Sequence, residues 1–334
     1  SFATFDEPNL VSSAGLVPLM KLADRAGLHQ LGDGHLSVPT DKGSNGGVKL
    51  ASLVAGMAAG ADSIDDMALL RHGAMGTLFD RPYAPSTLGS FLRKFTFGHV
   101  RQTDAIASRF VRALAEHTGL LGHESDTGTV MVDIDDTIVE VYGHAKQGAS
   151  FGYSGVRGLN ALLATVSTEQ IAPVIAAQRL RKGSAGSPRG AARLATDTLA
   201  LIRRTHLHGR DVLVRGDSAF YSHSMVTACL SAGAEVSVTV RMDPAVKRAI
   251  ATIDDDAWNT INYTDAIFDE HTNRWISRAE VAEVDFTAFT SKPKNDQVPG
   301  RLVVRRIPDL NPRAASGQAS LFDTWRFHAF FTTT

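Results

Sequence analysis

One strand decides the fold: Val130-Met131-Val132-Asp133-Ile134-Asp135-Asp136-Thr137-Ile138-Val139-Glu140-Val141. Apolar and β-branched residues dominate this run, which therefore predicts a β-strand. Because side chains alternate along a strand, Asp133, Asp135 and Thr137 share one face, and Asp136 points to the opposite face. The sequence thus places two carboxylates on one face of a strand, where their oxygens suit a hard divalent cation.

A second apolar run, Val212-Leu213-Val214-Arg215-Gly216-Asp217-Ser218, ends in an aspartate where a helix is expected to begin. An aspartate at a strand end, taken alone, is more often a helix cap or a turn residue than a ligand. The joint placement of Asp135 and Asp217 on two strands of one region favours a functional site over two separate caps.

The order of predicted elements around these strands defines the fold class. Strands are predicted at 130–141, 159–167, 172–180, 211–216 and 235–241, and helices at 188–205 and 222–232. This β-β-β-α-β-α-β order predicts an α/β fold with an RNase H-like mixed sheet and flanking helices. Segments rich in β-branched and aromatic residues follow at 258–277, 281–289, 301–307 and 325–332, and they predict a β-rich insertion.

Nucleases of the RNase H fold use two metal ions held by clustered carboxylates. One ion activates the attacking oxygen, and the other stabilises the leaving oxygen. We therefore predict Asp135 and Asp217 as catalytic residues and metal ligands, with Asp133 as a supporting ligand. The predicted cofactor is Mg2+ or Mn2+, with two ions in the active site.

The first third of the chain has a helical pattern. Apolar positions recur at spacings of three and four in 10–28, 48–70, 86–95 and 104–114, so an all-helical domain is predicted. Linkers are predicted at 32–34 and 40–47, and Ser86 is a candidate N-cap. The segment 86–101 is a candidate recognition helix, with a solvated helix face as the alternative. The predicted domains are 1–125 (helical, DNA-binding), 126–245 (RNase H-like core) and 246–334 (β-rich insertion and following strand).

Length and composition exclude several other classes of protein. With 334 residues, of which 43% are hydrophobic, the chain is long enough for two or three domains with a substantial core. The single cysteine, Cys229, excludes an intramolecular disulfide and is expected to be a small buried core residue. No apolar stretch is long enough to span a membrane, and no signal peptide is recognised, so a cytoplasmic location is expected.

Positive charge is concentrated in two windows, although the formal net charge is −1. Residues 144–215 hold eleven Lys or Arg against three acids, and residues 81–112 hold six against one. A run at 178–189 combines basic and small turn residues before a predicted helix, so its amides and guanidinium groups suit a DNA backbone. A solvated basic loop is the alternative. The predicted DNA-binding residues are Arg179, Arg181, Lys182, Arg189, Arg93 and Lys94.

Four motifs carry a resemblance to a known family. They are Val132-Asp133-Ile134-Asp135-Asp136-Thr137, Tyr142-Gly143-His144-Ala145-Lys146-Gln147-Gly148, Arg179-Leu180-Arg181-Lys182-Gly183 and Arg215-Gly216-Asp217-Ser218-Ala219-Phe220-Tyr221. The chain resembles DDE transposases of bacterial insertion sequences, the cut-and-paste branch whose RNase H-like core is interrupted by a β-rich insertion. In that resemblance the first catalytic Asp of the family falls on Asp135 and the second on Asp217.

The resemblance implies an activity and partners. The activity is Mg2+-dependent DNA strand cleavage at terminal inverted repeats, with hairpin-ended intermediates and transfer to target DNA. The implied partners are double-stranded DNA and a second copy of the chain in a homodimer, at the nucleoid of a bacterial cytoplasm. An insertion aromatic is also implied to capture a flipped base; Trp275 and Trp258 are candidates, with core packing as the alternative.

The family pattern also includes a third acid, a Glu on a helix that follows the β-rich insertion. The sequence ends at Phe330-Phe331-Thr332-Thr333-Thr334, which resembles the strand before that helix. The chain is therefore interpreted as C-terminally truncated, with no third catalytic Glu. Glu270, Glu280 and Glu283 fall within the insertion-like segment and are not assigned that role.

Two rival interpretations remain open at the level of sequence. Haloacid-dehalogenase-like phosphatases carry an Asp-x-Asp-x-Thr motif after an apolar strand, which would make Asp133 the nucleophile and Asp135 the acid/base. That fold needs a loop and a helix directly after the motif, whereas this strand is predicted to continue to Val141. The other alternative is a protein that binds DNA through its helical domain and basic core without cleaving it.

Overall fold

The computed structural model describes residues 9–39, 41–79, 82–143, 145–270, 274–308 and 325–334. The chain forms two compact units. One unit comprises Ser1–Asp126, Ala176–Leu180 and Leu201–His208, and the other comprises Thr127–Ile175, Arg181–Ala200 and Gly209–Thr334. The first long segment ends at Asp126, one residue after the predicted end of the helical domain.

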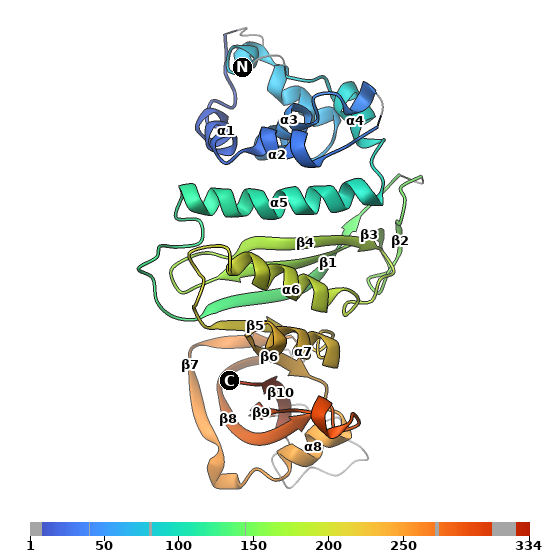
Figure 1. The fold of residues 1–334 in the computed structure, drawn as a ribbon. Helices are drawn as coiled ribbons and strands as arrows, with labels where there is room; N and C mark the ends of the chain where they lie inside the picture. The colour runs from blue at the N-terminus through green and yellow to red at the C-terminus, as the bar shows by residue number, and fades with distance from the viewer. Residues whose placement is uncertain (1–8, 40, 80–81, 144, 271–273, 309–324) are drawn as a thin grey trace. The chain divides into compact units, whose positions relative to one another are not determined.

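The regular elements described before Asp126 are all helical (Figure 1). They are α1 (Leu16–Arg25), α2 (Leu28–His35), η1 (Asp41–Gly43), α3 (Gly46–Ala58), η2 (Asp65–Arg71), η3 (Gly73–Thr77), α4 (Pro85–Leu92) and α5 (Phe97–His117). Leu53, Met67, Leu88 and Phe91 are buried together in their core. The predicted all-helical N-terminal region is confirmed.

The linker predicted at 32–34 is wrong, because α2 runs through it. A Cβ on Gly32 would lie 2.6 Å from the Cα of Gly47, so glycine is needed for the close approach of α2 to α3. Asp33 Oδ1 accepts a hydrogen bond of 2.7 Å from the Gly47 amide in the first turn of α3. The polar residue between the glycines thus satisfies a helix-end donor instead of marking a turn.

The candidate recognition helix at 86–101 is two helices, α4 and α5. α4 begins at Pro85, whose fixed φ and missing N–H suit the first helical position, so Ser86 lies inside the helix and is not its N-cap. Thr96 and His99 form a capping box that starts α5. The capping signal at residue 96 interrupts what the sequence presents as one basic helix.

After Asp126, the described part of the chain forms a sheet of ten strands. The first elements of this region are β1 (Val130–Glu140), β2 (Ser150–Phe151), β3 (Arg157–Ser167), β4 (Val174–Lys182), α6 (Ala191–Ile202), β5 (Val212–Gly216), α7 (His223–Ser231) and β6 (Glu235–Val240). β1 is antiparallel to β3 and parallel to β5, and β5 is parallel to β6. With β4 paired to β3, the order β4-β3-β1-β5-β6 is RNase H-like, which confirms the predicted fold class.

The two faces of β1 differ as the alternation predicts. Val130, Val132 and Ile134 are at most 2% exposed and form part of the core. On the other face Asp133 is partly exposed and Asp135 is exposed. The strand therefore contributes apolar side chains to the core from one face and carboxylates to the surface from the other.

The β-rich region continues the same sheet. It contains α8 (Pro244–Ile250), η4 (Asp255–Ala257), β7 (Asn259–Asp269), β8 (Arg274–Ala288), η5 (Lys294–Asp296), β9 (Val298–Pro308) and β10 (Trp325–Thr332). The break predicted between 277 and 281 is absent, because β8 runs through it. β10 pairs with β6 on one side and β9 on the other, so residues predicted as two domains, 126–245 and 246–334, share one sheet.

Cys229 lies on α7 and is fully buried, as predicted. Burial raises the pKa of its thiol to about 12, so the thiol is neutral at physiological pH. None of the helices in the described ranges combines the length and apolar character that a membrane crossing requires.

Candidate active site

The pairing of β1 with β5 brings Asp135 and Asp217 to neighbouring positions. The last paired residues of the two parallel strands are Ile134 and Gly216, and each aspartate is the next residue along its strand. Both side chains are exposed. Neighbouring strands lie about 5 Å apart, so the register puts the backbones of the two aspartates at the same level of adjacent chain segments.

Backbone amides orient both carboxylates. Asp135 Oδ1 accepts a hydrogen bond of 2.7 Å from the Asp136 amide. Asp217 Oδ1 accepts one of 2.8 Å from the Ala219 amide, in the turn that follows β5. Each aspartate therefore has one oxygen held by its own segment of backbone, which limits the directions that the carboxylate can take.

Asp133 forms an ion pair with Arg215, its direct partner in the strand register. Arg215 donates from Nε to Asp133 Oδ1 at 2.7 Å and from a terminal nitrogen to Oδ2 at 2.8 Å. The side chains are 42% and 38% exposed, and the hydrogen bond to Asp133 raises the pKa of Arg215. Because both oxygens of Asp133 are engaged, the predicted supporting ligand is already the partner of a cation.

The carboxylates of Asp135 and Asp217 fit a hard divalent cation in donor type. Asp135 and Asp217 offer exposed carboxylate oxygens from neighbouring strands, and Mg2+ is commonly bound through one or two carboxylates together with water and substrate oxygens. Within the described ranges no group of three or more Asp, Glu, His or Cys is placed to hold a metal. Two carboxylates alone would make up only part of the coordination sphere of such a cation.

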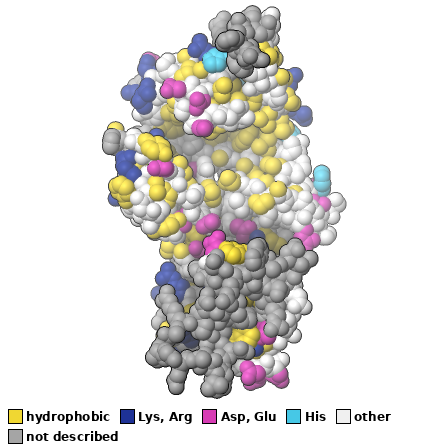
Figure 2. Space-filling model, turned by 180° about the vertical axis from the view of Figure 1, so that it is seen from behind, with side chains coloured by type: hydrophobic (Ala, Val, Ile, Leu, Met, Phe, Trp, Pro, Cys, Tyr) yellow, Lys and Arg dark blue, Asp and Glu magenta, His cyan; other side chains and the backbone are white. Residues whose placement is uncertain are grey.

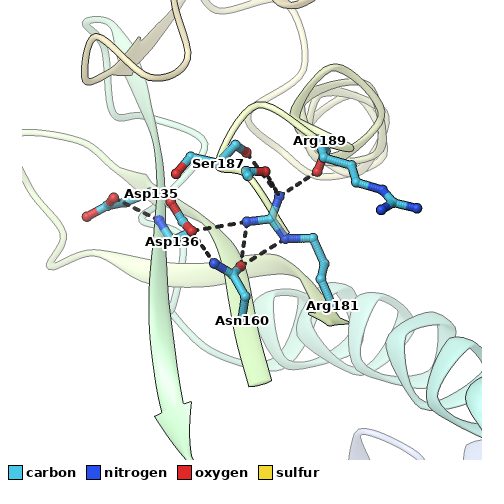
Figure 3. A network of polar contacts seen from close by, with 7 residues as sticks. Asp135, Asp136, Asn160, Arg181, Ser187 and Arg189 are labelled. Atoms are coloured by element: carbon cyan, nitrogen blue, oxygen red, sulfur yellow. Dashed lines mark hydrogen bonds and ion pairs between the residues drawn. The ribbon is translucent and has the colours of Figure 1, made fainter. Parts of the chain in front are cut away.

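The opposite face of β1 carries a buried polar network (Figure 3). Asp136 accepts hydrogen bonds from Arg181, at 3.1 Å, and from Asn160. Arg181 also donates from Nε to the Asn160 side-chain oxygen at 2.9 Å. The Arg181 and Asp136 side chains are only 8% and 5% exposed, and Asn160 is fully buried.

Arg181 is predicted as a DNA contact, but the structure gives its guanidinium partners inside the protein. One terminal nitrogen donates to the backbone carbonyls of Gly186, at 3.3 Å, Ser187, at 3.0 Å, and Arg189. Burial lowers the pKa of Arg181, and Asp136 opposes that shift, so the guanidinium remains charged. The donors of Arg181 are therefore occupied within the protein and shielded from solvent, unlike those of a side chain that contacts DNA.

Neither Asn160 nor the pairing of Arg215 with Asp133 is predicted from the sequence. The alternation along β3 does indicate that Asn160 is buried, because Asn160 shares a strand face with Leu162 and Ala164, which are both fully buried. A polar residue at a core position of an alternating strand requires a hydrogen-bonding partner. The identity of that partner depends on β4, which the strand pattern of β3 alone does not reveal.

The other predicted DNA contacts differ in exposure. Lys182 and Arg189 are exposed at the two ends of the loop that joins β4 to α6, and Arg93 and Lys94 are exposed at the end of α4. Arg179 is only partly exposed. On the face drawn in Figure 2, Lys and Arg side chains form small separate groups instead of one continuous patch.

The acids of the β-rich region have local partners. Glu280 accepts a hydrogen bond of 2.6 Å from Arg306, and Glu283 accepts one of 2.7 Å from Arg301. Trp258, a candidate for base capture, has the Arg306 guanidinium 4.1 Å from its ring centroid. The side chain of the other candidate, Trp275, lies outside the described residues.

The phosphatase alternative lacks its structural requirement. After Asp135, β1 continues to Glu140 in register with β3, where a loop and a helix would be needed. The strand that carries both aspartates is instead an interior strand between β3 and β5.

Most of the chain matches a known protein family. A family model described as a transposase DDE domain, group 1, matches residues 2–313. A search of curated proteins found no match. Among solved structures, the piggyBac transposase synaptic complex with hairpin DNA is similar over 100% of this chain and 54% of that chain, with 12% identity and a TM-score of 0.34. The chain thus spans about half the length of that transposase.

Proposed function

The chain belongs to the transposase DDE domain family, group 1, and on this basis we propose that it is a DNA transposase of an insertion sequence. The proposed reaction is metal-dependent strand cleavage at terminal inverted repeats, followed by transfer to target DNA. The proposed partners are double-stranded DNA and a second copy of the chain, at the bacterial nucleoid.

One observation supports this proposal above the others: the parallel pairing of β1 with β5 places exposed Asp135 and Asp217 at neighbouring positions. The two carboxylates contribute nothing to the core, since both side chains are exposed. Cation binding gives a reason for holding two acidic groups side by side, because they repel each other when no cation is present.

We propose that Asp135 and Asp217 hold Mg2+ or Mn2+, with two ions in the assembled site. When bound, such ions activate the attacking oxygen and stabilise the leaving oxygen of phosphoryl transfer. The backbone amides of Asp136 and Ala219 fix the orientation of the two carboxylates. Asp133 lies one step down the same face, where Arg215 neutralises its charge.

The proposed DNA contacts are the exposed cations Lys182 and Arg189 on the β4–α6 loop and Arg93 and Lys94 at the end of α4. Basic side chains of this kind neutralise phosphates and bind DNA without reading its sequence. Arg179 is a weaker candidate because it is partly buried.

Removal of either aspartate tests the metal site directly. We expect Asp135→Asn and Asp217→Asn each to weaken Mn2+ binding by at least about tenfold, because each removes a charged ligand. Isothermal titration calorimetry on the full chain measures this. The matched control is Asp211→Asn, which removes an exposed carboxylate next to the opposite end of β5. Equal Mn2+ affinity in all four proteins would overturn the proposed ligands.

A cleavage assay on plasmid DNA then separates catalysis from binding. Mn2+-dependent nicking that disappears in the Asp135→Asn and Asp217→Asn variants supports the transposase. Duplex DNA binding with no nicking, in a chain that binds Mn2+ through these aspartates, would favour a binding role for this stretch of the protein.

A further inference from the structure

The loop between β4 and α6 carries the exposed cations Lys182 and Arg189, yet its interior is fixed by a single buried side chain. Arg181 donates to three backbone carbonyls of this loop, those of Gly186, Ser187 and Arg189. Figure 3 shows the Arg181 guanidinium between these carbonyls on one side and Asp136 and Asn160 on the other. Arg181 therefore connects residues 186–189 of the loop to Asp136 on β1 and Asn160 on β3.

We propose that Arg181 is a positioning residue that holds the 183–190 loop in its DNA-binding shape, at a fixed distance from the Asp135 and Asp217 carboxylates. This inference rests on the proposed function, since it assigns the loop to the DNA that the site cleaves. Arg181 itself does not touch DNA. It acts through the backbone that it holds.

The chemistry of the guanidinium explains why an arginine occupies this position. Its planar array of N–H donors serves acceptors on several sides at once, which an ammonium group does less well because it is a compact point charge. Arg181 reaches Asn160 through two nitrogens, Asp136 through one of them, and the loop carbonyls through the third. The three carbonyls lie outside regular secondary structure, where a helix or sheet supplies no partner. The Gly186 carbonyl also accepts a turn hydrogen bond of 3.0 Å from the Arg189 amide.

A second anchor fixes the start of the same loop. A Cβ on Gly183 would lie 2.1 Å from the Gly158 carbonyl oxygen, so the loop backbone packs directly on β3. The Ser184 amide also donates to the Ser150 hydroxyl at 2.9 Å. The glycine contact holds the first residues of the loop, and Arg181 holds the residues from 186 to 189.

The network ends one residue from the proposed metal ligand. Asp136 accepts from Arg181 through its side chain, and its backbone amide donates to Asp135 Oδ1 at 2.7 Å. The same residue thus receives the loop anchor on one face of β1 and orients the carboxylate on the other (Figure 3). A fixed distance between the loop and the carboxylates would hold a loop-bound phosphate at a set position relative to Asp135 and Asp217. Catalysis depends on such positioning of the reacting groups.

Hydrogen exchange on the DNA-free full chain tests the positioning role. The test variant is Arg181→Met with Asp136→Asn, which removes both buried charges and leaves no unpaired ion. We expect amides of residues 185–190 to exchange at least about tenfold faster, while amides of β5 and α7 keep their rates. The control is Arg193→Met on α6, whose side chain is 72% exposed and which should leave the loop unchanged. Unchanged loop exchange in the double variant, or a uniform rise across the whole unit, would overturn the inference.

The salt dependence of DNA binding distinguishes positioning from direct contact. On a short mixed-sequence duplex, we expect the double variant to bind about 5- to 10-fold more weakly, because the loop must be ordered on binding. Its slope of log affinity against log salt should equal that of the wild type, since the same phosphates are neutralised in the complex. Lys182→Ala and Arg189→Ala should each reduce the slope by about one.

The DNA-binding and hydrogen-exchange measurements test different parts of the proposal. A reduced salt slope in the double variant would make Arg181 a phosphate contact and overturn the positioning role, as would an unchanged DNA affinity. If wild-type protein does not bind duplex DNA, the proposed function fails, and hydrogen exchange still decides whether Arg181 holds the loop.

Discussion

The two faces of β1 carry the same pair of residue types in two different environments. On the exposed face, Asp133 pairs with Arg215, and the side chains are 38% and 42% exposed. On the buried face, Asp136 pairs with Arg181, and the side chains are 5% and 8% exposed. The two aspartates are only three positions apart on one strand, so the type of element that carries them does not account for the difference.

Exposure to solvent determines how strongly the two charges of each ion pair interact. Water and salt screen the exposed pair, which therefore contributes little to stability and can rearrange when a ligand arrives. The buried pair has lost its hydration, so its charges depend on each other and on Asn160. The carboxylates on the exposed face of β1 are therefore accessible to a ligand, whereas the buried pair fixes the positions of the surrounding strands and loop.

Removal of one buried partner should have the largest effect. We expect Arg181→Met to lower the free energy of unfolding by about 3–5 kcal/mol, because Asp136 is left as an uncompensated buried charge. The matched variant on the other face, Arg215→Met, should cost only about 0–1 kcal/mol. Urea denaturation followed by circular dichroism measures both. Equal costs for the two variants would show that burial does not distinguish the pairs.

The second expected effect is recovery when both buried charges are removed together. Arg181→Met with Asp136→Asn should be more stable than Arg181→Met alone by about 1–3 kcal/mol, because no buried charge is then unpaired. A double-mutant cycle from the same urea curves gives the coupling energy. Additive costs would mean that the two side chains do not interact, in conflict with their 3.1 Å contact.

The exposed half of this comparison is largely predictable from sequence, because strand alternation alone places Asp133 and Asp135 on one face and Asp136 on the other. The order of strands and helices likewise predicts the neighbouring positions of β1 and β5. These features depend on local periodicity and on a known order of elements. They do not require knowledge of any individual side-chain contact.

The buried half is not predictable in the same way. Arg181 lies in a basic, glycine-containing run, a pattern typical of a solvent-exposed loop, and only the fold shows that its side chain turns inward to Asp136 and Asn160. The path of α2 through Gly32 has a similar origin, since the glycine serves a close approach to α3 and not a turn. In both cases a partner distant in sequence overrides the local signal.

The ionisation of two tyrosines, Tyr221 and Tyr142, offers a further comparison between a buried and an exposed group. Burial, with a smaller contribution from Asp243, raises the pKa of Tyr221 from 10.0 to about 12. A raised folded pKa stabilises the protein below pH 10, and this contribution is lost as pH rises from 10 to 12. We expect wild-type stability to fall more steeply than that of Tyr221→Phe in this window, by at most about 1.4 kcal/mol per pH unit.

The control for that measurement is Tyr142→Phe. Tyr142 is 82% exposed, and its pKa is raised mainly by a hydrogen bond to Glu140 at the surface. Urea denaturation at several pH values between 9 and 12 should therefore separate Tyr221→Phe from the wild type and leave Tyr142→Phe close to it. The same pH dependence in all three proteins would show that burial of Tyr221 does not govern its ionisation.

Ionic strength should produce the smallest difference between the two faces of β1. The Debye length falls from about 10 Å at 0.1 M salt to about 3 Å at 1 M, so the half-exposed Asp133–Arg215 pair is screened much more than the buried pair. We expect the small cost of Arg215→Met, about 0–1 kcal/mol, to approach zero in 1 M NaCl, while the cost of Arg181→Met persists. Urea denaturation at both salt concentrations measures the change.

Because the salt acts equally on the rest of the protein, each variant must be compared with wild type at the same concentration. If the cost of Arg215→Met instead stays constant, the Asp133–Arg215 pair is a rigid part of the framework, and the availability of this face for chemistry would then depend on Asp135 and Asp217 alone.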